Sequence, residues 1–147
     1  MSIAAIRTRL IGLIRDPERQ RDYRRRGRVA VGNTAHNACA ATASQVYLQL
    51  GVLSHIELGA EGLATAIKTT KRFDASADRN DVKPGDLIVC EDNNSNGLSD
   101  HVWLVVALQP GGWYECLDNQ GKTLTHSRRV DGGDSKTAMR GRLRILT

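Results

Sequence analysis

The chain has 147 residues, 40% of them hydrophobic, which suits one well-packed domain and is too short for two ordinary ones. Its three widely spaced cysteines exclude a dense disulfide framework and indicate synthesis in a reducing compartment. The longest apolar run, residues 102–108, is far below the ~20 residues needed to cross a bilayer. The N-terminus shows no signal-peptide pattern. We therefore expect a soluble protein made in the cytoplasm without a signal peptide.

The net charge of +5 is concentrated near the N-terminus. Residues 1–30 contain nine arginines and three acidic residues, a balance of +6, so the remainder of the chain carries −1. Within this segment, apolar residues from Ile3 to Ile14 recur at helical spacing and arginines occupy other positions. We expect residues 1–30 to form a basic amphipathic helix or arm ahead of a domain at 31–147. The arm could dock on its own domain, on an anionic membrane or wall polymer, or on nucleic acid. No nucleic-acid-binding motif accompanies the charge.

Helices are predicted before strands. Apolar periodicity predicts helices at about 2–15, 38–50 and 58–70. Residues 73–81 are polar and are predicted to be a loop, which ends in a Pro-Gly turn. Five short apolar segments separated by glycine-rich or asparagine-rich turns predict strands at 87–90, 101–108, 113–118, 123–130 and 140–146. This order predicts an α+β fold with a mainly antiparallel sheet of about five strands.

Cys39 lies where a loop of small polar residues leads into the predicted helix 38–50. Asn37 is a plausible N-cap, and Gly51 is a plausible C-terminal stop. In the first turn of a helix, unpaired backbone N–H groups and the helix dipole favour thiolate over thiol. Cys39 is therefore a candidate nucleophile. The alternative is a small buried thiol with no chemical role.

His101 opens the most hydrophobic predicted strand, directly after the polar loop 92–100. A histidine at the start of a strand borders both core and solvent, where a general base can reach a thiol on a neighbouring helix. The alternative is an ordinary strand-end histidine that is hydrogen-bonded to the loop backbone.

Asp118 and Asn119 end the following predicted strand. Adjacent antiparallel strands can place the end of one beside the start of the other, so either side chain could contact His101. Accepting a hydrogen bond from one ring nitrogen would fix the tautomer, and a carboxylate would also stabilise the imidazolium. The same residues are equally typical of a hairpin turn.

In their order along the chain, these features resemble the papain-like peptidoglycan hydrolases, the superfamily of CHAP and NlpC-type amidases and endopeptidases. The resemblance covers roughly residues 33–121. It is carried by four segments, namely Asn37-Ala-Cys39-Ala-Ala41, Val82-Lys-Pro-Gly-Asp-Leu-Ile-Val89, His101-Val-Trp-Leu-Val-Val106 and Leu117-Asp-Asn-Gln120.

The resemblance implies a papain-like fold in which residues 31–147 form the catalytic domain. It implies a cysteine hydrolase that cleaves amide bonds in peptidoglycan stem peptides, as a phage lysis protein or an antibacterial effector acting in the periplasm or cell wall. The basic segment would suit an anionic envelope surface, and an immunity protein or holin is a conceivable partner. One alternative is a cysteine protease or deamidase with a protein target. Another is a non-catalytic module that binds nucleic acid or anionic membrane.

The resemblance also implies roles for single residues. Cys39 would be the nucleophile and His101 the general base and acid, while Asp118 or Asn119 would orient His101. Asn33 is the candidate side-chain donor to the oxyanion hole. No metal or organic cofactor is implied. Because the residues around Cys39 differ from the Asp-Cys-Ser of the NlpC branch, the amide bond that is cleaved stays open.

Metal sites are not expected. Residues 92–97 match the first half of an EF-hand loop, but the twelfth position is Trp103 and not a bidentate glutamate. A zinc site would need convergence of four residues distributed along the chain, namely His36, Cys39, Cys90 and His101.

The remaining cysteines and histidines carry no predicted chemistry. Cys90 and Cys116 alternate with apolar neighbours on predicted strands, and we expect both in the core. His55 and His126 have no supporting pattern.

Overall fold

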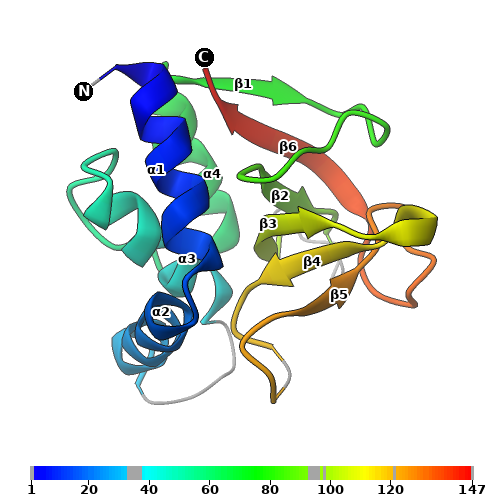
Figure 1. Ribbon diagram of the computed structural model, residues 1–147, viewed down its shortest axis with the longest axis horizontal. Helices are drawn as coiled ribbons and strands as arrows, with labels where there is room; N and C mark the ends of the chain where they lie inside the picture. The colour runs from blue at the N-terminus through cyan, green and yellow to red at the C-terminus, as the bar shows by residue number, and fades with distance from the viewer. Residues whose placement is uncertain (1, 33–37, 93–96, 98, 121, 147) are drawn as a thin grey trace.

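A computed structural model describes residues 2–32, 38–92, 97, 99–120 and 122–146. Its helices are α1 (Ile3–Arg15), α2 (Pro17–Ala30), α3 (Cys39–Gln49) and α4 (Ala60–Thr69), and a short 3₁₀ helix, η1, spans Pro110–Gly112. The strands are β1 (Phe73–Ser76), β2 (Leu87–Cys90), β3 (Val102–Leu108), β4 (Tyr114–Leu117), β5 (His126–Arg128) and β6 (Met139–Ile145). The α+β class is confirmed: the helices gather on one side of a sheet formed by the later part of the chain (Figure 1). Among the described residues, no helix is both long and apolar enough to span a membrane.

The sheet has the strand order β1-β6-β2-β3-β4-β5, and every neighbouring pair is antiparallel. The described residues thus form six strands instead of about five. The additional strand, β1, lies within 73–81, so the prediction of a loop there was wrong. β1 pairs only with β6, and its two central residues, Asp74 and Ala75, are both exposed. An edge strand of this kind lacks the alternation of buried and exposed residues by which strands are predicted.

A second helix, α2, follows α1 within the basic segment and was not predicted separately. Asp16 ends α1, and its side chain accepts a hydrogen bond of 3.0 Å from the backbone N–H of Glu18, so it is also the N-cap of α2. Pro17 occupies the first helical position, where its missing N–H costs nothing. α2 packs closely on α3 through Gly27, where a Cβ atom would overlap the Thr42 hydroxyl.

The core lies on both faces of the central strands. Between helices and sheet, Leu10 and Ile14 of α1 pack into the same cluster as Leu87 and Leu104. On the opposite face, a smaller cluster includes Trp103, Cys90 and Cys116. Successive strand residues point to opposite faces, so β2 is buried along its whole length. Because Leu10 and Ile14 belong to this core, the structure shows that the apolar side of the basic segment docks on the chain's own domain.

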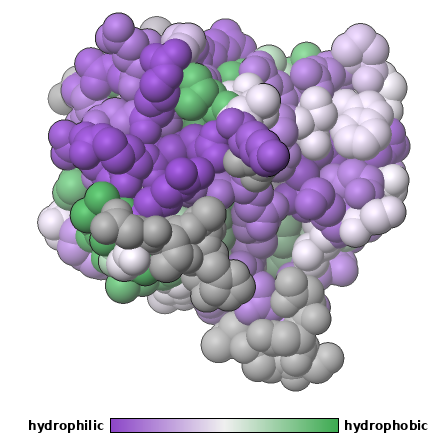
Figure 2. Space-filling model, turned by 90° about the horizontal axis from the view of Figure 1, so that it is seen from below, coloured by the Kyte–Doolittle hydropathy of each residue, from purple (hydrophilic) through white to green (hydrophobic). Residues whose placement is uncertain are grey.

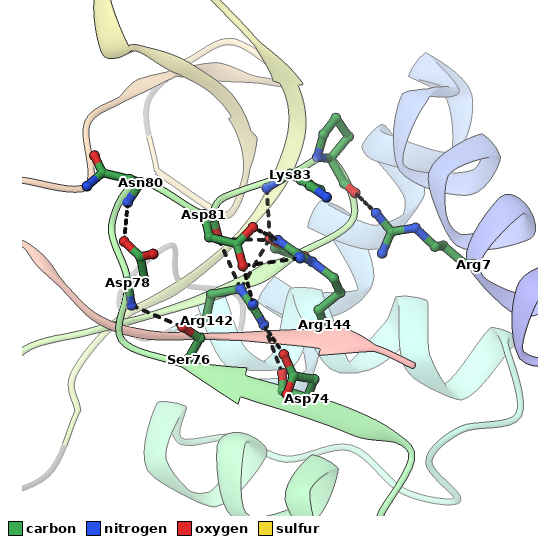
Figure 3. A network of polar contacts seen from close by, with 11 residues as sticks. Arg7, Asp74, Ser76, Asp78, Asn80, Asp81, Lys83, Arg142 and Arg144 are labelled. Atoms are coloured by element: carbon green, nitrogen blue, oxygen red, sulfur yellow. Dashed lines mark hydrogen bonds and ion pairs between the residues drawn. The ribbon is translucent and has the colours of Figure 1, made fainter. Parts of the chain in front are cut away.

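Hydrogen bonds between arginine and aspartate side chains connect β6 to β1 and to the turn before β2 (Figure 3). Arg142 donates to Asp74 over 2.9 Å and to Asp81 over 2.6 Å. Arg144 makes two hydrogen bonds of 2.8 Å to the fully buried Asp86. Asp86 also accepts a 2.8 Å hydrogen bond from the backbone N–H of Lys83. The aspartate of the Pro-Gly-Asp segment thus closes its own turn and ties that turn to the C-terminal strand.

Candidate active site

Cys39 is the first residue of α3 and is buried, with 7% of its surface exposed. The N-cap is Ala38, which makes no side-chain capping hydrogen bond. Asn37, the N-cap predicted from the sequence, lies outside the described residues. α3 presents Ala43, Val46 and Tyr47 to the core and packs on β3. This packing holds the start of α3, and with it the thiol, beside the start of β3.

His101 lies directly before β3 and is buried. Its backbone carbonyl accepts hydrogen bonds from the N–H of Cys90, at 3.0 Å, and from the Ser99 hydroxyl, at 3.2 Å. The backbone N–H of Ser99 donates to the Glu61 carboxylate of α4 over 2.9 Å. Contacts from both β2 and α4 therefore fix the backbone that carries the imidazole.

Asp118 follows β4 and faces His101. The register pairs Leu104 with Leu117, which brings the start of β3 next to the end of β4. His101 Nε2 lies 2.9 Å from Asp118 Oδ2, and the Asp118 side chain is fully buried. Since Nε2 faces the carboxylate, Nδ1 is the nitrogen left for the thiol.

Asn119 contacts other partners. Its side-chain oxygen accepts from Arg28 Nε over 2.8 Å, and its amide donates to Thr42 Oγ1 over 2.7 Å and to the Arg24 carbonyl over 2.9 Å. These contacts join the end of β4 to α2 and α3. Of the two residues left open by the sequence, the structure brings Asp118 to His101 and not Asn119. Asn33, the proposed oxyanion-hole donor, lies outside the described residues.

The thiol and the imidazole are electrostatically coupled. Burial raises the pKa of the Cys39 thiol, but hydrogen bonding to His101, the charge of His101 and the backbone N–H of Val102 together bring that pKa below its ordinary value. Burial lowers the pKa of His101, but Asp118 and Cys39 raise it to about 9. These opposite shifts favour the thiolate and imidazolium pair over the neutral thiol and imidazole.

His126 contacts the other oxygen of the same carboxylate, which the sequence analysis missed. His126 Nε2 lies 2.8 Å from Asp118 Oδ1 and 3.4 Å from Cys116 Sγ. Burial raises the pKa of Asp118, but hydrogen bonds from His101 and His126 hold it far below its usual range. Cross-strand pairing could have revealed this contact, because Cys116 pairs with His126 and Asp118 lies two residues further along the same face.

One group of described side chains could hold a metal ion. Ligand atoms of Cys116, Asp118 and His126 lie within 4.8 Å of one another, a donor set that Zn²⁺ accepts. Such an ion would take Asp118 Oδ1 away from its present hydrogen bonds. The zinc set considered from sequence is a different one, and its member His36 lies outside the described residues. Most of the EF-hand-like loop lies there too.

Cys90 and Cys116 are fully buried, which confirms their predicted place in the core. Burial raises the pKa of Cys90 to about 11 and that of Cys116 still further. Among the three thiols, Cys39 is therefore the one whose surroundings favour the reactive thiolate.

The site thus brings together a thiol at the start of α3, an imidazole directly before β3 and a carboxylate directly after β4; electrostatic coupling links Cys39 to His101, and a 2.9 Å hydrogen bond links His101 to Asp118. Comparison of the chain with protein-family models and with curated proteins finds no match. Its function is inferred below from the site geometry together with the sequence resemblance.

Proposed function

We propose that this protein is a cysteine hydrolase with a papain-like catalytic domain that cleaves amide bonds in the stem peptides of bacterial peptidoglycan. The observation that carries the proposal is the series Cys39, His101 and Asp118, in which a helix-start thiol meets an imidazole whose far nitrogen is held by a buried carboxylate. Nucleophile, general base and orienting group are the parts that acyl transfer requires.

In the first step, the Cys39 thiolate attacks the amide carbonyl carbon and a carbon–sulfur bond forms. The carbon–nitrogen bond then breaks, and His101 gives its proton to the departing amine. The carboxylate of Asp118 stays ionised throughout and keeps the imidazole oriented. The products of this step are a thioester on Cys39, a free amine and a neutral His101.

In the second step, water attacks the thioester while His101 removes a proton from that water. The carbon–sulfur bond breaks, a carboxylic acid is released, and the proton on His101 restores the ion pair with Cys39. One water is consumed for each amide bond cleaved.

The negative oxygen that develops on the carbonyl needs a donor near Cys39. The backbone N–H of Cys39 is the first N–H of α3. The first N–H groups of a helix have no partner within that helix. In α3 the hydrogen bonds along the helix begin with the N–H of Thr42, which donates to the carbonyl of Ala38, so the N–H of Cys39 has no partner within the helix. This N–H supports an oxyanion hole at the nucleophile itself.

An anionic partner is supported by a groove of about 440 Å³ beside the site. It lies between α2 and the segment after β4, and its charged lining is entirely basic, consisting of Arg21, Arg24, Arg25, Arg28 and Lys122. The face of the molecule seen from below in Figure 2 is largely hydrophilic. We propose that this groove faces the anionic envelope; the Arg21→Gln, Lys122→Gln double variant should then bind sacculi with a weaker salt dependence than the wild type.

Purified sacculi test the substrate and the nucleophile together. Wild-type protein should release soluble fragments with new free amino groups and no new reducing sugars, whereas Cys39→Ala should release none. Cys90→Ala is the matched control, because it removes a buried thiol whose side chain packs in the core cluster on the opposite face of the sheet. Equal release by wild type and Cys39→Ala would eliminate the proposal. Activity on a protein substrate but not on sacculi would instead favour the alternative: cleavage of the chain would indicate a protease, and release of ammonia from side-chain amides would indicate a deamidase.

A further inference from the structure

We propose that His126 is a positioning residue of this site, which holds Asp118 so that Asp118 can hold His101. The inference rests on the proposed function, because it concerns the same catalytic series. It adds a fourth member, from β5, to a series otherwise drawn from α3, β3 and β4.

The two oxygens of Asp118 are divided between the two histidines. Oδ2 lies 2.9 Å from His101 Nε2, and Oδ1 lies 2.8 Å from His126 Nε2. Oδ1 also accepts a 2.8 Å hydrogen bond from the backbone N–H of Gln120. With both oxygens engaged and the side chain fully buried, the carboxylate has one well-defined orientation.

This orientation needs fixing because the last torsion of an aspartate is broad and has no sharp staggered minima. Without His126, the backbone N–H of Gln120 would be the one hydrogen-bond donor to Oδ1 left among the described residues. The carboxylate could then rotate, and His101 would lose the fixed acceptor that keeps its other nitrogen toward Cys39.

The position of His126 is set by the sheet. It pairs with Cys116 across β4 and β5, and Asp118 lies two residues beyond Cys116 on the same face. Its side chain is 20% exposed, so its second ring nitrogen can meet solvent while Nε2 points inward. As an N–H donor to Asp118, His126 carries its proton on Nε2.

Substitutions at His126 distinguish the loss of its hydrogen bond to Asp118 from the loss of its side-chain volume. Gln places an amide N–H at about the reach of Nε2, Asn falls short of it, and Ala removes it. His55→Ala is the matched control, since His55 is exposed and pairs with Glu57 at 2.6 Å. For each variant, the rate at which iodoacetamide alkylates Cys39 is followed from pH 5 to pH 10 by peptide mass mapping, with a chelator present. Folding is checked by the melting temperature.

We expect His126→Ala and His126→Asn to lower alkylation at neutral pH by about tenfold, the lower end of the effect typical of such supporting contacts, with little change at pH 10. His126→Gln should keep the wild-type profile. If the His126 variants only disturbed the fold, the rate of Cys39 alkylation would fall equally at all pH values, and this result would overturn the proposal. A wild-type profile in both His126→Ala and His126→Asn would overturn the proposal.

The wild-type protein gives an independent result that does not depend on how the variants fold. Nitrogen NMR shifts of the ring should show a proton on Nε2 of His126, and an unprotonated Nε2 would overturn the proposal. Loss of wild-type alkylation at neutral pH in chelator, with recovery on adding Zn²⁺, would also overturn it in favour of a metal at Cys116, Asp118 and His126. Alkylation needs no substrate, so this outcome is separate from that of the sacculus experiment.

Discussion

Replacing Asp118 by asparagine probes the proposed active site with little change in shape. The carboxylate accepts hydrogen bonds from both histidines, whereas an amide has one accepting oxygen and one donating nitrogen. One histidine must then face an N–H group with its own N–H, or change tautomer. The variant therefore removes the negative charge beside His101 and disturbs the orientation of the ring at the same time.

The structure gives the size of the electrostatic part. The pKa of His101 rises from 6.5 to about 9, which corresponds to a preference for imidazolium of about 3 kcal/mol. The hydrogen bond to Asp118 is the first of the contacts that raise this pKa, and a hydrogen bond to a charged group contributes about 1.5–3 kcal/mol. Losing about 1.5 kcal/mol lowers the equilibrium constant for forming the thiolate and imidazolium pair by about tenfold. The disturbed orientation lowers turnover further, so kcat/KM should fall by about 100-fold or more.

The assay is the rate of Cys39 alkylation at pH 7 together with hydrolysis of a soluble peptidoglycan fragment. Asp131→Asn is the control, because it makes the same chemical change at an exposed carboxylate that pairs with Arg129. A folded Asp118→Asn variant whose Cys39 alkylates at pH 7 as fast as in the wild type would refute the reasoning.

Two further predictions concern pH and packing. The pKa of Cys39 is lowered and that of His101 is raised to about 9, so hydrolysis should rise at a pH below the ordinary thiol pKa as the thiolate forms, and should fall as His101 loses its proton near pH 9. A single rise at the ordinary thiol pKa of about 8.5 would contradict the ion pair. In Gly27→Ala the added Cβ would lie 2.9 Å from the backbone nitrogen of Thr42, so α2 and α3 must separate and the free energy of unfolding should fall by about 2 kcal/mol, measured by urea denaturation. Gly12→Ala is the control, because nothing lies within 4 Å of its new Cβ and it should gain up to about 1 kcal/mol; equal stability of the two variants would contradict the close packing.

Much of the fold could be predicted from the sequence because its central elements carry strong patterns. β2 and β3 are nearly continuous apolar runs, and the apolar side of α1 has helical spacing. Two elements that were not predicted separately, α2 and β1, lack such patterns. α2 packs through a glycine contact and buries Gln20 and Arg24, while β1 is a polar edge strand.

The site was harder to predict because it depends on register. Sequence order indicated Cys39 and His101, but Asp118 and Asn119 are neighbours whose side chains point in different directions. Only the pairing of β3 with β4 decides which of the two faces the histidine. His126 was missed for the same reason, since its partner lies across a strand pair and not nearby in sequence.

The central claim is that Cys39 forms a covalent intermediate with the substrate, and trapping that intermediate tests the claim most directly. Wild-type protein is mixed with a soluble peptidoglycan fragment, quenched in acid during turnover, digested and analysed by mass spectrometry. We predict that the peptide containing Cys39 gains the mass of the acyl part of the fragment as a thioester, and that His101→Ala shows less of it. Hydrolysis that continues after Cys39 has been blocked by alkylation, with no adduct on the peptide, would contradict the account.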